Sequence, residues 1–179
     1  VALNDKNPDL TDLRHTRRDL SIEQSLQLAL QQDQFVVYFQ PIMDLASGLI
    51  SGCEALIRWQ HTEQGFQPPD LFIPHCENSG LIIELGYLIA EQACRFQKAI
   101  AGTFNPDFFT SINLSIKQFD DQDLIARLIS IVDAEASLPD LIKFEITESL
   151  LMSNPEQMHA ALTQLKQNGI KLVIDDFGT

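Results

Sequence analysis

The sequence has few cysteines, no long uncharged apolar run and no recognisable targeting segment. Its three cysteines, Cys53, Cys76 and Cys94, have no CxxC spacing. This argues against a disulfide framework and favours a reduced compartment. The most apolar stretch, 81–90, contains Glu84 and is shorter than the roughly 18 residues of a membrane span. We therefore expect a cytoplasmic domain, and any membrane anchor of the full-length protein would come from segments outside this sequence.

Basic residues are also scarce. The 179 residues include 12 Lys and Arg against 25 Asp and Glu, for a formal charge of -13 at pH 7. Such a charge repels polyphosphate, so we expect no DNA or RNA partner bound through a basic surface. An anionic ligand would need metal ions or local arginines. The hydrophobic content of 45% is enough to build the core of one ordinary domain.

The first twenty residues are polar and carry several basic side chains, among them Arg14 and Arg17. This composition predicts a linker over 1–20 from an upstream module, followed by one domain over 21–179. Ser21 is a candidate N-cap for a short helix with apolar residues between Leu26 and Leu30.

The rest of the chain alternates between strand and helix patterns. An aromatic and β-branched run at 35–39, a polar turn at 44–48 and a second run at 49–59 predict an antiparallel hairpin. Further strands are expected at 108–115, 142–147 and 170–174, and helices at 69–79, 81–100, 121–136 and 155–168. Strands that alternate with helices of this length predict an α/β fold with a mostly parallel sheet.

Three of these strands end on carboxylate or amide side chains. The residues concerned are Asn113, Glu145 with Glu148, and Asp175 with Asp176. In a parallel α/β protein such ends lie on one face, where active sites form. Any single one could instead enter a solvated turn or cap a helix. Three together, with Glu54, favour a site for hard divalent cations such as Mg²⁺ or Mn²⁺.

The second strand should present Glu54, Leu56 and Arg58 on one face, because side chains alternate along a strand. At roughly 3.3 Å per residue, Glu54 and Arg58 are about 13 Å apart, so they cannot hold the same ion. This spacing favours Arg58 as a clamp for a phosphate group.

Seven ordered motifs carry a family resemblance: 38–42 (YFQPI), 54–59 (EALIRW), 72–74 (FIP), 79–82 (SGLI), 113–115 (NLS), 144–149 (FEITES) and 175–179 (DDFGT). Together they resemble the EAL-domain cyclic di-GMP phosphodiesterases, from about residue 21 to the end. The resemblance implies a modified TIM-type (β/α)₈ barrel whose first strand is antiparallel, incomplete in this chain. It also implies metal-dependent hydrolysis of cyclic di-GMP to linear pGpG in bacterial signalling.

The resemblance further implies the roles of individual residues. Two divalent cations would be held by the positions matching Glu54, Asn113, Glu145, Asp175 and Asp176. Of these, Glu54, Glu145, Asp175 and Asp176 would be catalytic. Gln40, Leu56 and Arg58 match substrate-contacting positions. Glu148 matches a glutamate that steadies the loop after the Asp-Asp strand, with a simple carboxylate at a helix entry as the alternative.

The EAL-domain phosphodiesterases that this sequence resembles use a further lysine, glutamate and glutamine in their active sites, from later strands that would lie beyond Thr179. We therefore expect the fragment alone to be inactive. Two alternatives stay open: a catalytically inactive cyclic di-GMP receptor, and a regulatory domain that acts through protein contacts. The resemblance is compatible with an upstream sensory or GGDEF domain and with a homodimer.

Overall fold

The structure is a computed structural model that describes residues 10–135, 138–147 and 155–175. Side chains are described from residue 21 onward within these ranges, except for those of Gln157 and Asp175.

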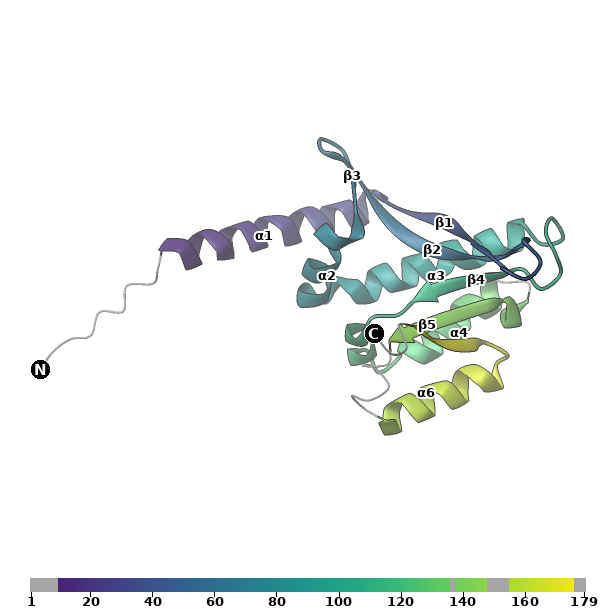
Figure 1. The fold of residues 1–179 in the computed structure, drawn as a ribbon. Helices are drawn as coiled ribbons and strands as arrows, with labels where there is room; N and C mark the ends of the chain where they lie inside the picture. The colour runs from purple at the N-terminus through teal and green to yellow at the C-terminus, as the bar shows by residue number, and fades with distance from the viewer. Residues whose placement is uncertain (1–9, 136–137, 148–154, 176–179) are drawn as a thin grey trace, which may run out of the picture.

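A mixed sheet forms the centre of the molecule (Figure 1). Its strands are β1 (Phe35–Met43), β2 (Ile50–His61), β3 (Gly65–Gln67), β4 (Phe109–Asn113), β5 (Ile142–Thr147) and β6 (Lys171–Asp175). The order is β1-β2-β4-β5-β6, with β3 paired to β2. β1 and β3 run antiparallel to β2, and the β2-β4, β4-β5 and β5-β6 pairs are parallel. This confirms the predicted hairpin and mostly parallel α/β sheet, which is open within the described residues.

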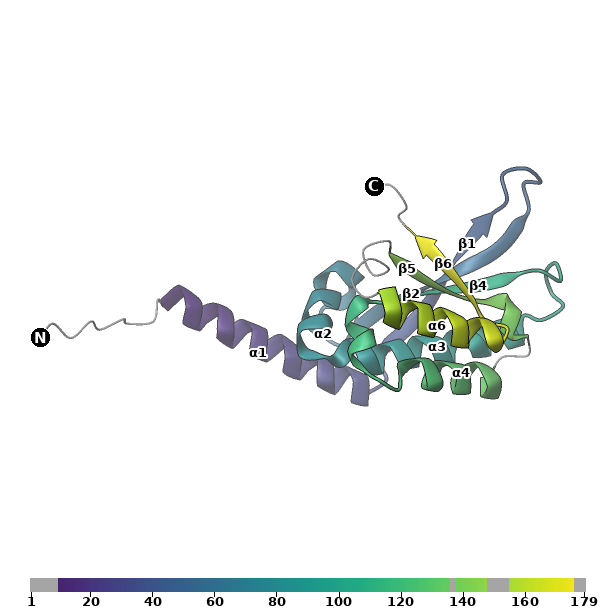
Figure 2. The ribbon, with the colours of Figure 1, turned by 90° about the horizontal axis from the view of Figure 1, so that it is seen from below.

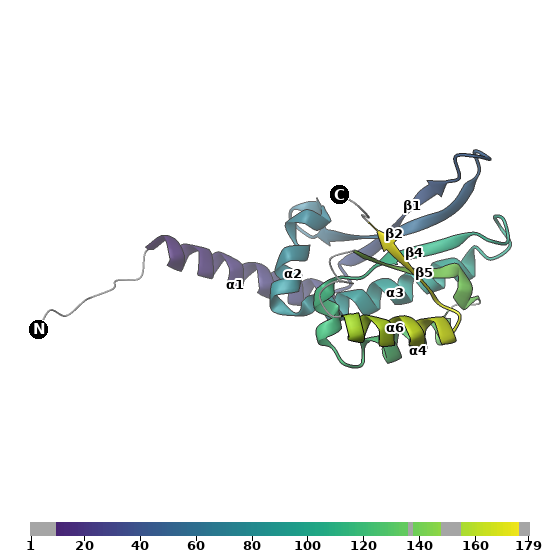
Figure 3. The ribbon, with the colours of Figure 1, turned by 60° about the horizontal axis from the view of Figure 1, so that its bottom comes forward.

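The main helices lie on one side of this sheet (Figures 2 and 3). They are α3 (Leu81–Ala99), α4 (Leu124–Glu135) and α6 (Pro155–Gln167). The shorter α2 (Ile73–Ser79) precedes α3, and 3-10 turns occupy η1 (Pro69–Leu71), η2 (Ile116–Asp120) and η3 (Pro139–Leu141). None of the described helices combines the length and apolar character needed to cross a bilayer. The opposite face of the sheet carries no described helix, and we call it the accessible face because Gln40 and Asn113 on it are exposed and Glu54 is half-buried.

The prediction for the first thirty residues was wrong in one respect. Helix α1 (Leu10–Gln31) begins eleven residues before Ser21, so Ser21 lies inside the helix and is not its N-cap. The Ser21 carbonyl accepts a hydrogen bond of 2.9 Å from Ser25 Oγ. The segment contains neither glycine nor proline and is rich in Leu, Arg and Gln, which favour helix even where the surface is polar. The start of α1 projects away from the sheet and the other helices (Figure 1).

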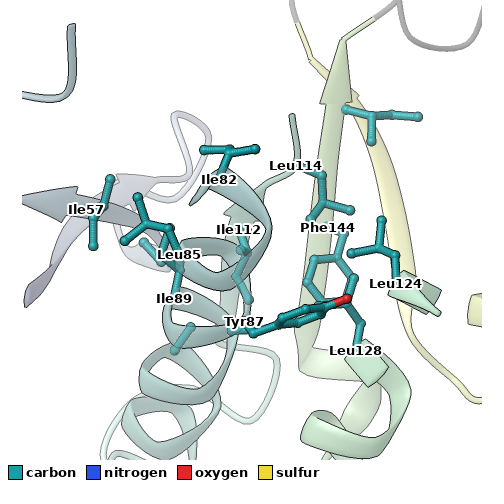
Figure 4. Packing of buried hydrophobic residues seen from close by; sticks show 14 of the residues in the cluster. Ile57, Ile82, Leu85, Tyr87, Ile89, Ile112, Leu114, Leu124, Leu128 and Phe144 are labelled. Atoms are coloured by element: carbon teal, nitrogen blue, oxygen red, sulfur yellow. The ribbon is translucent and has the colours of Figure 1, made fainter. Parts of the chain in front are cut away.

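The core lies between the sheet and the helices (Figure 4). Ile112 of β4 and Phe144 of β5 are register neighbours, and both are fully buried. They face Leu85 of α3 and Leu128 of α4, which are also fully buried. Burial of a side chain of this size contributes about 1.5–3 kcal/mol. The core therefore fixes the strands in register, and this register positions the residues on the accessible face.

Candidate functional site

The strand register places several predicted site residues side by side on the accessible face. Gln40 of β1 pairs with Glu54 of β2, and Asn113 of β4 pairs with Glu145 of β5. The Asn113 amide donates a hydrogen bond of 2.6 Å from Nδ2 to Glu54 Oε1. Glu54, Asn113 and Glu145 thus form a row across three neighbouring strands.

The remaining acidic residues are described only in part. Asp175 pairs with Thr147 at the end of β6, two residues beyond Val173, which is the partner of Glu145, and the side chain of Asp175 lies outside the described residues. Asp176 and Glu148 also lie outside them, so their roles stay predictions. Among the described side chains, no three from His, Cys, Asp and Glu lie close enough together to hold a metal.

The donor chemistry of the row fits a hard divalent cation. Glu54 and Glu145 are half-buried carboxylates, and Asn113 is exposed. Because Asn113 donates to Glu54 through Nδ2, its Oδ1 faces elsewhere and can act as a neutral oxygen ligand. Carboxylate and amide oxygens are the ligands that Mg²⁺ and Mn²⁺ prefer.

The two faces of β2 differ as the sequence predicted. Glu54, Leu56 and Arg58 are half-buried on the accessible face. Cys53, Ala55, Ile57 and Trp59 are buried on the core face. Arg58 lies four residues along the strand from Glu54, so the cation ligands and the guanidinium occupy separate parts of one face.

A hollow of about 320 Å³ surrounds Arg58. Its lining residues are Tyr38, Arg58, Phe66, Gln67 and Pro68. The Arg58 guanidinium carbon is 5.9 Å from the centre of the Tyr38 ring. That ring meets Phe66 edge-on, with 5.6 Å between ring centres. The Arg58 guanidinium donates once to the Ile57 carbonyl, at 2.8 Å from Nη1, and its other N–H groups can bind an anion.

Sequence reasoning missed Tyr38 and Phe66 as residues of this hollow. The strand alternation that grouped Glu54 with Arg58 also places Tyr38 on the face of Gln40, two residues away, so Tyr38 could have been found. Phe66 gave no such signal, because its position depends on the pairing of β3 with β2.

Two lysines adjoin the carboxylate row. Lys143 lies two residues before Glu145 and pairs with Lys171 across β5 and β6. The Lys143 ammonium lies 3.1 Å from the centre of the Phe109 ring. Burial lowers the pKa of Lys143, the charge of Lys171 lowers it further, and Glu145 opposes both effects. The accessible face thus carries positive charge close to its carboxylates.

Comparison with known proteins establishes the family. The EAL domain model matches residues 23–179. This chain belongs to the EAL domain family. An uncharacterized protein of Synechocystis is 42% identical over 161 residues, covering 89% of this chain. The MucR protein of Pseudomonas aeruginosa, named a bifunctional diguanylate cyclase/cyclic di-GMP phosphodiesterase, is 31% identical over 92% of this chain.

Solved structures of EAL proteins share the fold. A c-di-GMP complex of the PaMucR phosphodiesterase superimposes with a TM-score of 0.83 at 31% identity, covering 89% of this chain and 64% of that one. The structural likeness confirms the predicted TIM-like EAL fold. This chain spans only 23% of the length of the Synechocystis protein and 24% of MucR.

Proposed function

We propose that this chain is part of an enzyme that hydrolyses cyclic di-GMP to linear pGpG. The observation that carries the proposal is the row of Glu54, Asn113 and Glu145, joined by the Asn113–Glu54 hydrogen bond. The relatedness to MucR supports the choice of substrate. The protein would act in cyclic di-GMP signalling in the cytoplasm.

The proposed metal ligands are Glu54, Asn113, Glu145, Asp175 and Asp176. Two bound Mg²⁺ or Mn²⁺ ions would supply Lewis-acid stabilisation of the negative charge on the reacting phosphate. The chain itself contributes the oxygen ligands and their alignment. Glu148 would steady the segment that follows β6.

The substrate would lie along the accessible face, between the carboxylate row and the hollow at Arg58. Arg58 would hold a phosphate oxygen through its free N–H groups, which favour oxyanions. Gln40 would add a polar contact, and Leu56 an apolar one. The Tyr38 and Phe66 rings offer aromatic surface beside Arg58 for part of the substrate.

We also propose how the complete protein is organised. Residues before 21 would join an upstream sensory or GGDEF domain, as the bifunctional name of MucR suggests by analogy. Residues 21–179 would form part of an EAL barrel, and the complete protein would be capable of forming a homodimer.

The test is hydrolysis of cyclic di-GMP by the full-length protein with Mg²⁺ or Mn²⁺, with pGpG measured by liquid chromatography. Glu54→Gln keeps the shape of the side chain but removes its charge, so it should lower kcat/KM by at least about tenfold. Glu63→Gln is the matched control, because Glu63 is exposed in the turn between β2 and β3.

The outcomes separate the proposal from its rivals. Production of pGpG that requires Glu54 but not Glu63 supports the phosphodiesterase. Binding of cyclic di-GMP without cleavage would instead identify the protein as a cyclic di-GMP receptor. If the protein neither binds nor cleaves cyclic di-GMP, the result would favour a domain that acts through protein contacts.

A further inference from the structure

The backbone that leaves β4 is held in place immediately after Asn113. The Leu114 N–H donates to the Glu145 carbonyl at 2.8 Å, and the Leu114 side chain is buried. The next residue, Ser115, is the N-cap of η2. Only Leu114 therefore separates the proposed ligand Asn113 from a helix cap, so the position of that cap constrains the backbone at Asn113.

Ser115 is fixed by three hydrogen bonds of different kinds. Its hydroxyl donates to Glu77 Oε1 of α2 at 2.6 Å, and the same oxygen accepts from the Lys117 N–H at 3.2 Å. Its N–H donates to Gln118 Oε1 at 2.9 Å. The bonds to Lys117 and Gln118 close a local capping box. The bond to Glu77 is the one that ties this local turn to a distant element.

The Glu77 bond is suited to fix an orientation. Hydrogen bonds to a carboxylate are shorter and stronger than those between neutral groups. A hydroxyl has one hydrogen. Because the Ser115 hydroxyl donates this hydrogen to Glu77 in a hydrogen bond, the oxygen lone pairs of Ser115 face the η2 N–H groups. Both Glu77 and Ser115 are half-buried, which limits competition from water.

We propose that Glu77 is a positioning residue that acts through Ser115 to hold Asn113 where it ligates the cation. This rests on the proposed metal site. Residues that orient the ligands of a metal change its affinity by about 10–100-fold when removed. The effect belongs to metal binding, so it differs from a general loss of stability.

The test uses the full-length protein and four variants: Glu77→Ala, Glu77→Gln, Ser115→Ala and the Glu77→Ala/Ser115→Ala double variant. Mn²⁺ binding is measured by calorimetry, melting by scanning fluorimetry, and cyclic di-GMP hydrolysis as a function of Mn²⁺ concentration. The control is Glu84→Ala, because Glu84 is an exposed carboxylate in the first turn of α3.

Each single alanine variant should raise the Kd for Mn²⁺ by about tenfold. The double variant should lose no more than either single variant, because both remove the same bond. Glu77→Gln should lose less, since its amide oxygen still accepts from Ser115. The KM for cyclic di-GMP at saturating Mn²⁺ should not change, and Glu84→Ala should behave as the wild type.

Unchanged Mn²⁺ affinity in Glu77→Ala, or a fall in melting temperature alone, would overturn the positioning role. Additive losses in the double variant would show that Glu77 does not act through Ser115. A wild-type protein that binds no Mn²⁺ would also overturn it. If the variants weaken Mn²⁺ binding but no form cleaves cyclic di-GMP, the positioning role stands and the proposed enzymatic function fails.

Discussion

A methyl group added at Gly86 should destabilise the protein through a single neighbour. Gly86 is buried in α3, and a Cβ at this position would overlap the Gln118 amide nitrogen and lie 2.8 Å from its Cδ. Carbon atoms in normal contact are about 3.5–4.0 Å apart. The Gln118 side chain must therefore move by about 1 Å, although it is only 2% exposed.

The expected change in the free energy of unfolding is the sum of two costs and one gain. Overpacking of a filled core costs about 1–3 kcal/mol. Loss of the Gln118 acceptor for the Ser115 N–H costs about 1 kcal/mol more. Alanine favours helix over glycine by about 1 kcal/mol in the opposite direction. Gly86→Ala should thus lower the free energy of unfolding by about 1–3 kcal/mol, or the melting temperature by about 6 °C.

The assay is a double-mutant cycle with Gln118→Ala, followed by thermal unfolding. Gln118→Ala removes the side chain that the new methyl meets, so Gly86→Ala in this background should gain about 1 kcal/mol from helix propensity alone. The effect of the same substitution changes sign between the two backgrounds. Equal destabilisation in both would show that the Gly86–Gln118 contact does not determine the cost.

Three further predictions concern other parts of the chain. Burial raises the pKa of the Cys76 and Cys94 thiols to about 12. Neither should react with a disulfide reagent at pH 8 until the protein unfolds, and rapid labelling of the native protein would contradict this. The Tyr87 hydroxyl donates to Asp121 Oδ2 at 2.7 Å and is the main cause of the lowered pKa of Asp121. A carboxyl whose pKa is lowered by folding adds stability above its unfolded pKa of 3.8 and loses it as the pH falls through the folded pKa. Tyr87→Phe should therefore lower the melting temperature more at pH 6 than at pH 3, and a pH-independent difference would refute the linkage. Arg58→Lys should raise the KM for cyclic di-GMP about tenfold with little change in kcat, since a lysine cannot form the planar fork of N–H groups. A fall in kcat alone would place Arg58 in the chemical step.

The sequence predicted the strands better than the first helix. Alternation along 53–59 assigned the core and accessible faces of β2 correctly, because a strand buried on one face constrains every second residue. The segment 10–20 carried no apolar periodicity, but it contains no glycine or proline to break a helix, and its Leu and Arg residues favour helix. A polar composition therefore does not distinguish a linker from an exposed helix.

The candidate site was predictable where it depends on strand ends. Asn113 and Glu145 were grouped because parallel strands end at one edge, and the register places them as neighbours. The contact of Glu77 with Ser115 joins residues 38 positions apart, one at the end of a predicted helix and one at the end of a predicted strand, and neither pattern indicates that the two elements meet. Contacts that form only when α2 packs against the segment after β4 cannot be predicted from the local sequence pattern.

Helix α1 joins the domain rigidly at one end and projects from it at the other. Leu26 and Ala29 are buried in the core, and only three residues separate the last turn of α1 from β1, one of them Asp33 at a positive φ of 54°. A helix turns by about 100° with each residue. Inserting one residue into the projecting half of α1 would therefore rotate anything attached to its start by about 100° around the helix axis, and inserting seven would bring it back to within about 20° of the original direction. The length of α1 thus sets the angular phase between this domain and whatever precedes it, independently of any contact between the two.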